Sequence, residues 1–261
     1  MSGWIPPIVR TLLAGYPVPP SMIDPSYPQL IQRIGGLELT LLITLAGLLS
    51  GFALGVILLA CRRNPLTGPG RDPGEQLLGQ AVRGAAIAVV EGVRGLPIIL
   101  LVLLVFTLPY PITGLQLPNF VLAAAAFGLY AAVFVEESAR SGLRSVDPQL
   151  PAAGRVLGLT GRQIFLRIEL PLVFRTMRPD LINTAVTLFK DSSTLAVVAV
   201  PELTYTGRQM MLSDPAIYGA ALLAVLILYW APATAFSAVA VRAERRRTRA
   251  EGFAVRNTMI E

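Results

Sequence analysis

The sequence predicts an all-α integral membrane protein with about five transmembrane helices. Of its 261 residues, 54% are hydrophobic and only 15% are charged, and the mean hydropathy is +0.62. A soluble domain usually carries about 25% charged residues, so this deficit places the chain among membrane proteins. Apolar runs that reach the roughly 20 helical residues needed to cross a bilayer core recur along the chain.

Five apolar runs, taken in order, are predicted to cross the membrane. The fourth is weaker than the others because the stretch FKDSSTLA, at 189–196, interrupts it. The predicted spans are 37–61, 85–108, 120–137, 180–200 and 217–241. They divide the chain into an extracytoplasmic segment over 1–36, a transmembrane domain over 37–241 and a basic cytoplasmic tail over 242–261.

The arginines predict on which side of the membrane each loop lies. Cytoplasmic loops carry an excess of Lys and Arg. With the N-terminus outside, the outer segments hold only Arg10, Arg33 and Arg208, while the other arginines that lie between or after the spans fall inside. The C-terminus is therefore expected in the cytoplasm. The net charge of +6 is explained by this topology, and no nucleic-acid partner is expected.

The scarcity of reactive side chains excludes several kinds of site. The chain has one cysteine, Cys61, and no histidine. A disulfide framework, a Cys/His zinc site and a histidine-dependent triad or dyad are thus excluded, and we expect neither a metal nor a cofactor. The only lysine, Lys190, follows no glycine-rich turn and precedes an aspartate, so the chain has no P-loop for ATP hydrolysis.

Polar residues inside the spans are candidates for a substrate path or a gate, because such residues usually face a bundle interior or a cavity. The candidates are Thr40, Thr44, Glu137, Asn183, Thr187, Lys190, Asp191, Ser192 and Ser193. Glu91 and Arg94 are three residues apart and share a helix face, which predicts a structural ion pair. Glu137 and Arg140 have the same spacing and the same explanation.

The stretch FKDSSTLA places Lys190 beside Asp191 in an apolar surrounding. On a continuous helix the two side chains would point about 100° apart and would not pair easily. Two interpretations remain open. Either both side chains face protein and water, or the helix breaks here and Ser192 and Ser193 cap the next piece.

The inside loop over 139–178 is the longest between predicted spans. Its sequence predicts a short helix over 152–159, a turn at Thr160-Gly161 and a second helical piece, RQIFLRIEL, closed by Pro171. Apolar residues in both pieces predict one packed face and one face offered to a partner. A glycine at 158 would permit the turn that the loop needs.

Several motifs in fixed order resemble the ABC importer permeases of the polar amino-acid uptake family. Gly158 and the Ile-x-Leu-Pro that begins at Ile168 match the G-x9-I-x-L-P spacing of their cytoplasmic coupling loop. The other matching motifs are Leu37-x-x-Thr40-Leu41, VEGVRGLP at 90–97, Phe134-x-x-Glu137-x-x-Arg140, Asn183, KDSS at 190–193 and VPEL at 200–203. The resemblance covers about residues 35–247.

This resemblance implies a type I ABC importer permease fold in a bacterial inner membrane. It also implies an ATP-driven importer that takes amino acids from a periplasmic solute-binding protein into the cytoplasm. The predominantly apolar spans and the scarcity of unpaired acidic residues favour neutral amino acids. A cytoplasmic ATPase dimer would hold ATP and Mg, and a second permease subunit would complete the pore. The residues implied in ATPase coupling are Ala152, Ala153, Gly154, Leu157, Gly158, Leu159, Leu170 and Pro171.

The chain departs from the family pattern at the Glu-Ala-Ala for which the coupling loop is named. Counting back from Gly158 places Ala152-Ala153-Gly154 there, preceded by Pro151, so the glutamate is absent. One explanation is that the second permease is non-identical and keeps the intact motif.

Two other classes of function fit the sequence less well. A self-sufficient secondary transporter or channel for small polar solutes would give the structured inside loop no purpose, and five spans do not divide into equal repeats. A membrane-embedded enzyme would need a site built from carboxylates or from Ser and Lys, and the spans offer no converging carboxylates.

Overall fold

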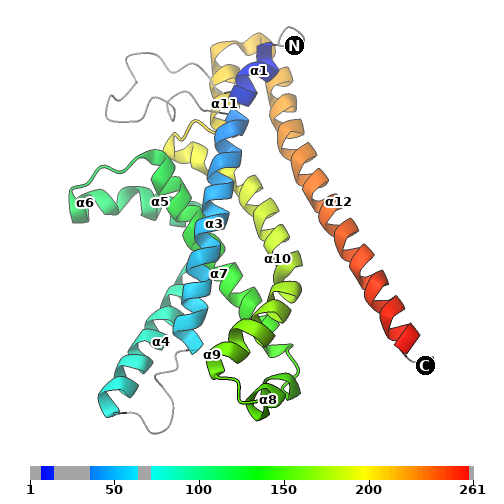
Figure 1. Ribbon diagram of the computed structural model, residues 1–261. Helices are drawn as coiled ribbons and strands as arrows, with labels where there is room; N and C mark the ends of the chain where they lie inside the picture. Colours follow the sequence, from blue (N-terminus) through cyan, green and yellow to red (C-terminus); the bar gives the residue numbers. More distant parts are fainter. Residues whose placement is uncertain (1–6, 15–35, 64–71, 259–261) are drawn as a thin grey trace.

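The computed structural model describes the backbone of residues 7–14, 36–63 and 72–258, and side chains within these ranges as far as Arg242. Within them the chain is almost entirely helical, with one isolated backbone bridge between Gly36 and Glu202. Most of the predicted segment over 1–36 lies outside the described residues. Figure 1 shows long helices that run between two ends of an elongated bundle.

The helices follow one another with short connections. In order they are α1 (Pro7–Ala14), α3 (Gly36–Arg63), α4 (Pro73–Arg94), α5 (Ile98–Thr107), α6 (Pro109–Thr113), α7 (Asn119–Arg144), α8 (Gln149–Val156), α9 (Gly161–Ile164), the π-helical turn η3 (Phe165–Glu169), α10 (Leu170–Asp191), the 3₁₀ segment η4 (Ser192–Val198), α11 (Leu203–Ser213), the 3₁₀ turn η5 (Pro215–Ile217) and α12 (Tyr218–Thr258).

The centre of the bundle is the pair α3 and α7, which pack along most of their length. Three glycines on one face of α3 allow this contact. A Cβ added at Gly47, Gly51 or Gly55 would lie 2.5–2.7 Å from a Cβ on α7. Small residues four apart let two membrane helices approach closely, so this stripe fixes how α3 and α7 meet.

The predicted second span, 85–108, is wrong as a single straight helix. The structure breaks it after Arg94, and α4 and the α5–α6 segment meet at 115°. The cause is local: Pro97 has no backbone N–H and restricts the residue before it, so the helix ends at Gly95 and restarts at Ile98. In Figure 1, α5 and α6 turn sideways from the bundle.

The described residues contain three helices that are long and apolar enough to cross a membrane: α3, α7 and the 28 residues from Pro215 to Arg242. The bent pair of α4 with α5–α6 makes a fourth if it counts as one span. The fourth predicted span, 180–200, corresponds to the end of α10 and to η4. Charged residues along α10 keep it out of this group although it packs between α7 and α12.

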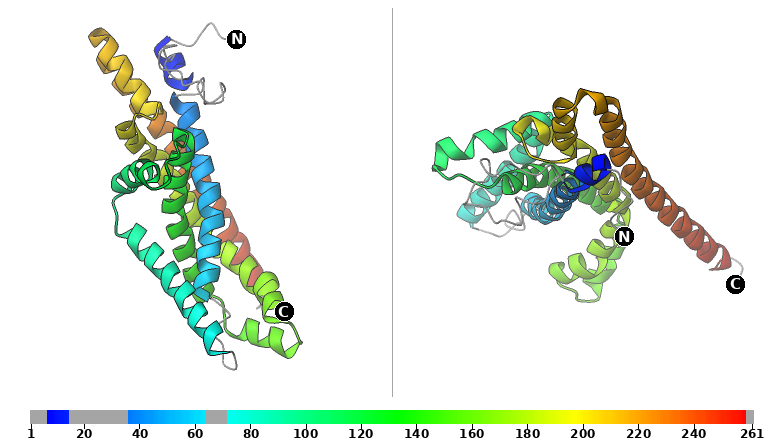
Figure 2. Two further views of the ribbon diagram at one scale, coloured as in Figure 1. Left: turned by 90° about the vertical axis from the view of Figure 1, so that its left-hand side faces the viewer. Right: turned by 90° about the horizontal axis from the view of Figure 1, so that it is seen from above.

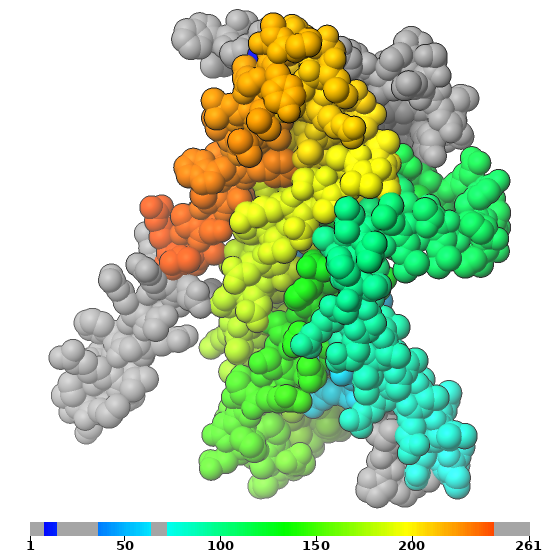
Figure 3. Space-filling model, turned by 180° about the vertical axis from the view of Figure 1, so that it is seen from behind, coloured from blue at the N-terminus to red at the C-terminus, as the bar shows by residue number. Residues whose placement is uncertain are grey.

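The two ends of the bundle differ. One end holds α1, the start of α3 and α11, where Gly36 N donates to Pro201 O over 2.9 Å. The other end holds α8, α9 and the first turns of α4. Figure 2 shows α12 leaving the bundle at an angle, and Figure 3 shows α4 and α12 spreading apart on either side of α7 and α10.

Candidate functional site

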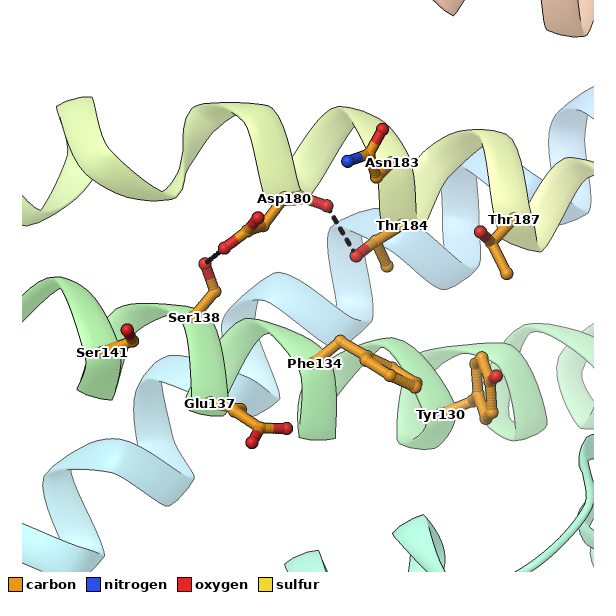
Figure 4. A pocket seen from close by; sticks show the side chains of 9 residues that line it. All are labelled: Tyr130, Phe134, Glu137, Ser138, Ser141, Asp180, Asn183, Thr184 and Thr187. Atoms are coloured by element: carbon orange, nitrogen blue, oxygen red, sulfur yellow. Dashed lines mark hydrogen bonds between the residues drawn. The ribbon is translucent and has the colours of Figure 1, made fainter.

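A polar groove of about 420 Å³ lies between α7 and α10. Its lining is drawn in Figure 4 and consists of Tyr130, Phe134, Glu137, Ser138, Ser141, Asp180, Asn183, Thr184 and Thr187. The spacing of these residues is helical on both elements, so each helix presents one polar stripe. The opposite face of α7, which includes the buried Ala131 and Val135, packs on the glycines of α3.

Hydrogen bonds hold one part of the groove and leave another part open. Ser138 Oγ on α7 donates to Asp180 Oδ2 on α10 over 2.5 Å, and Thr184 Oγ1 donates to Asp180 O over 2.8 Å. Figure 4 shows Ser138 and Asp180 pointing toward each other. Within the described part of the chain, the side chains of Asn183 and Thr187 form no hydrogen bond, so both can bind a solute.

The structure brings three of the predicted path residues, Glu137, Asn183 and Thr187, together in this groove. It places Thr40 and Thr44 elsewhere. Thr40 is fully buried, and its hydroxyl accepts from Leu203 N at the start of α11. Thr44 Oγ1 donates to Thr40 O within α3. Both threonines therefore serve the packing of α3 at the α11 end of the bundle.

The predicted ion pair between Glu91 and Arg94 is wrong. Arg94 Nη1 lies 3.1 Å from Glu137 Oε1 on α7, and Glu91 lies 3.9 Å from Arg62 on α3. Glu137 is thus paired to α4, and the expected Glu137–Arg140 pair is wrong as well. The reason is that α4 ends beside α3 and α7, whose charged side chains reach the two residues from outside their own helix.

Glu136, which the sequence did not single out, is the buried carboxylate of this region. Its side chain is 0% exposed and accepts from Arg62 Nη1 over 2.9 Å. Arg140 Nε lies 3.7 Å from the other oxygen, and neither of those two atoms has a hydrogen-bond partner. Glu136 and Glu137 are adjacent in the sequence. They differ in that Glu136 lies on the buried face of α7 and contacts Arg62 of α3, whereas Glu137 is partly exposed.

The stretch FKDSSTLA does end the α-helix. α10 stops at Asp191, and 192–198 continue as the tighter η4, so of the two interpretations left open the structure has the change of helix type. The predicted capping is not found: Ser192 Oγ donates back to Phe189 O over 2.8 Å and lies 3.2 Å from the Tyr229 hydroxyl. Lys190 is exposed and Ser193 is partly buried. Lys190 and Asp191 form no ion pair with each other, and neither lines the groove.

Beyond η4, a buried carboxylate organises the end of the bundle that holds α11. Glu202 is 0% exposed and caps α11 by accepting from Thr204 N at 2.9 Å and Tyr205 N at 2.8 Å. The Tyr229 hydroxyl of α12 donates to it over 2.7 Å. Burial raises the pKa of Glu202, and these hydrogen bonds oppose the rise. The VPEL motif contained this residue, but its tertiary partner could not be identified from the sequence.

The loop over 139–178 is structured, as predicted, but its elements differ from the predicted ones. The first helix, α8, spans Gln149–Val156 and not 152–159, and the turn lies at Leu157-Gly158, before Thr160-Gly161. α8 ends at Val156, Gly158 takes a φ of +76°, and Thr160 and Gln163 form a capping box that starts α9. The second helical piece is not closed by Pro171. It passes through η3 directly into α10, where Pro171 occupies the first turn, in which its missing N–H is not needed.

The loop also has the predicted packed and offered faces. Gly154 is buried, and a Cβ added there would meet Ile164 and Ile168 at 3.0–3.1 Å. Val156 and Leu157 are 88% and 79% exposed. The other predicted coupling residues are placed around this turn: Ala152, Ala153 and Leu159 on or beside α8, and Leu170 with Pro171 at the start of α10.

These features define a class: a multispan helical membrane protein with a polar groove between two helices and a structured loop at one end. Residues 76–249 match the family model described as "Binding-protein-dependent transport system inner membrane component". The chain belongs to this family, whose members are the membrane subunits of such transport systems.

Relatives and solved structures agree with this assignment. The chain is 30% identical over 192 residues to the glutamine transport system permease protein GlnP of Escherichia coli (strain K12), covering 73% of this chain and 80% of that protein. It is 26% identical over 192 residues to the L-cystine transport system permease protein TcyB of Bacillus subtilis (strain 168), covering 74% and 75%. A crystal structure of an amino acid ABC transporter with histidines superposes with a TM-score of 0.69 at 22% identity, covering 81% of this chain and 92% of that chain, which shows the shared fold.

Proposed function

We propose that this chain is the permease subunit of an ATP-driven importer that carries amino acids across a bacterial inner membrane into the cytoplasm. One observation carries the proposal: a single helix joins the exposed loop to the polar groove. η3 runs without a break into α10, and α10 presents Asp180, Asn183 and Thr187 to the groove. Movement imposed on the loop would therefore pass along α10 to the substrate path.

The chemistry of the groove suits a zwitterion. Asp180 can accept hydrogen bonds from an ammonium group, while the Asn183 amide and the Thr187 hydroxyl can donate to a carboxylate. The other carboxylate of the groove, Glu137, is compensated by Arg94. Asp180 is therefore the carboxylate of the groove that has no cationic partner among the described residues, and it would pair with the ammonium group of the substrate. Among the lining residues named above, no further charged group is then left to pair with a charged substrate side chain, so neutral amino acids are the favoured class. Relatives named for glutamine, L-cystine and arginine transport support amino acids as the substrate class.

The ATPase would dock on α8. Val156 and Leu157 form an exposed apolar patch at the turn before Gly158, and this patch is suited to a groove on a cytoplasmic partner. ATP and Mg would be bound by two copies of that ATPase, because the chain carries no P-loop. The excess of arginine at this end supports a cytoplasmic location for it. The end with α1 and α11 would then face an extracytoplasmic solute-binding protein.

A second permease subunit, non-identical to this one, would complete the pore. The motif glutamate is missing at Ala152-Ala153-Gly154, so this chain offers the ATPase no carboxylate there. A partner with the intact motif would supply that contact. If this chain, expressed alone with the ATPase, assembles and transports, the requirement for a non-identical subunit is refuted.

The test is uptake into proteoliposomes that contain the assembled transporter, with a purified solute-binding protein outside and ATP inside. Labelled glutamine is followed first, and unlabelled neutral, acidic and basic amino acids then compete with it. We expect accumulation that requires both ATP and the binding protein, with neutral amino acids competing best. Uptake without internal ATP would refute an ATP-driven importer, and competition only by basic amino acids would refute the neutral preference.

A further inference from the structure

A second cavity, separate from the groove, lies among α3, α4, α7 and η3. Its volume is about 310 Å³, and it lies toward the end of the bundle that carries α8. The lining is five arginines, one glutamate and three aliphatic residues: Arg62, Arg63, Arg83, Arg140, Arg144, Glu169, Leu59, Ile87 and Leu143. It shares no residue with the groove between α7 and α10.

The positive charge of this cavity is only partly compensated. Carboxylates lie within 4 Å of three arginines: Arg62 contacts Glu136 and Glu91, Arg63 contacts Glu169, and Arg140 contacts Glu136. Three carboxylates thus face five guanidinium groups. Among the described residues, no carboxylate lies within 4 Å of Arg83 on α4 or of Arg144 on α7.

One ion pair beside the cavity is also incomplete. The Nε of Arg140 is buried, lies 3.7 Å from Glu136 Oε1 and has no hydrogen-bond partner. This atom is closed off from a ligand, so Glu136 pairs with the Arg140 guanidinium only over this longer distance. The positive charge of Arg140 thus adds to that of the two uncompensated arginines.

The lining favours an anion that also carries hydrocarbon. Guanidinium groups bind phosphate oxygens in pairs through their planar fork. Leu59, Ile87 and Leu143 add an apolar surface that inorganic phosphate would not use. The cavity lies at the ends of the spans α3 and α7, at the level where lipid headgroups meet a membrane protein. Basic pockets between membrane helices on the cytoplasmic side are suited to anionic headgroups.

We propose that this cavity binds the phosphate headgroup of an anionic phospholipid from the cytoplasmic leaflet, with Arg83 and Arg144 as its main contacts. The leaflet follows from the orientation proposed above, while the site itself requires only that the chain spans a membrane. Arg83 lies on α4 and Arg144 at the end of α7, so a headgroup that contacts both would join the two helices. The bound lipid therefore stabilises the position of α4 relative to α7. The first turns of α4 spread from the bundle (Figure 3).

The experiment counts lipids on the assembled transporter by native mass spectrometry. The delipidated complex is titrated with phosphatidylglycerol or with phosphatidylcholine, for the wild type and for the double variant Arg83→Gln/Arg144→Gln. The matched control is Arg175→Gln/Arg208→Gln, which removes the same charge from two exposed arginines that line neither cavity. Inorganic phosphate is added as a competitor, and the single variants Arg83→Gln and Arg144→Gln are measured in case the double variant does not fold.

The wild type and the control are expected to bind phosphatidylglycerol roughly tenfold tighter than phosphatidylcholine, and the double variant to lose most of this preference. Inorganic phosphate at millimolar concentration should not displace the lipid. Absence of a preference in the wild type overturns the proposal, as does an equal preference in the double variant and the control. Displacement by inorganic phosphate would assign the site to a soluble anion. Loss of the ATPase with unchanged lipid binding would assign it to a protein contact.

Discussion

Ser138 on α7 donates a hydrogen bond to Asp180 on α10 over 2.5 Å, so the two helices that line the polar groove are joined by side chains across it. α10 is also the helix that continues from the exposed loop through η3. The bond therefore joins α10, the helix proposed to transmit movement, to the central α3–α7 pair.

Asp180→Asn tests whether this carboxylate receives the ammonium group of the substrate. The variant keeps an oxygen that can accept from Ser138 but removes the charge. The KM of uptake in proteoliposomes should rise roughly tenfold, because a hydrogen bond to a charged group contributes about 1.5–3 kcal/mol. Ser138→Ala, which keeps the charge, is the control and should change KM less. An unchanged KM in Asp180→Asn would remove Asp180 from the substrate path.

Gly158→Val tests the turn that follows α8. Gly158 has a φ of +76°, and a β-branched residue is strained there although its Cβ would meet nothing within 4 Å. We expect the left-handed backbone conformation to cost valine about 1–2 kcal/mol, and the turn to rearrange locally to relieve this strain. ATPase co-purification should fall while the thermal stability of the spans stays the same. Gly161→Val, at a glycine with open space and no positive φ, is the control; equal ATPase recovery from both variants would contradict the prediction.

Gly51→Ala tests the close contact of α3 with α7. The added Cβ would lie 2.5 Å from Ala131 Cβ and 2.8 Å from Gly128 O. Overpacking of this kind costs about 1–3 kcal/mol, so the thermal midpoint in detergent should fall. Gly84→Ala on α4 adds the same methyl group into open space and should be neutral or stabilising. Equal midpoints for the two variants would show that the helices do not meet at Gly51.

Arg62→Ala and Arg94→Ala separate a buried ion pair from an exposed one. Arg62 is 14% exposed and its partner Glu136 is 0% exposed, whereas Arg94 and Glu137 are 50% and 40% exposed. Removing Arg62 leaves a buried carboxylate without its main partner and should cost about 3–5 kcal/mol of folding free energy. Removing Arg94 should cost less than about 1 kcal/mol. Thermal unfolding of both variants measures the two losses of stability. A larger loss in Arg94→Ala than in Arg62→Ala would contradict the burial of the Arg62–Glu136 pair.

The spans and the loop could be predicted from the sequence because each depends on local signals. Apolar length located α3 and α7, and the G-x9-I-x-L-P spacing located Gly158, although the turn itself was predicted slightly later, at Thr160-Gly161. The adjacent charges at Lys190 and Asp191 left a helix break as one of two interpretations, and α10 ends there. The bend between α4 and α5 had a local signal too, in Gly95 and Pro97, but the apolar run across it hid the break.

Tertiary partners could not be predicted, because spacing within one helix does not show which neighbour lies nearby. Arg94 pairs with Glu137 rather than with Glu91 for this reason. Glu136 and Glu137 are adjacent in the sequence, yet only Glu136 faces α3. The groove was predicted in part, since Asn183 and Thr187 were identified from their polarity, while Ser138 and Asp180 required the structure.

The most direct test of the central claim measures uptake and ATP hydrolysis together in proteoliposomes, for the wild type and for Val156→Asp/Leu157→Asp. The substitutions place carboxylates on the exposed end of α8 without changing the groove. If the ATPase docks on this exposed apolar patch, the variant loses ATP-dependent uptake, and its ATPase activity no longer responds to the loaded binding protein. Uptake that continues at the wild-type ratio of amino acid to ATP in this variant would contradict coupling through α8 and α10.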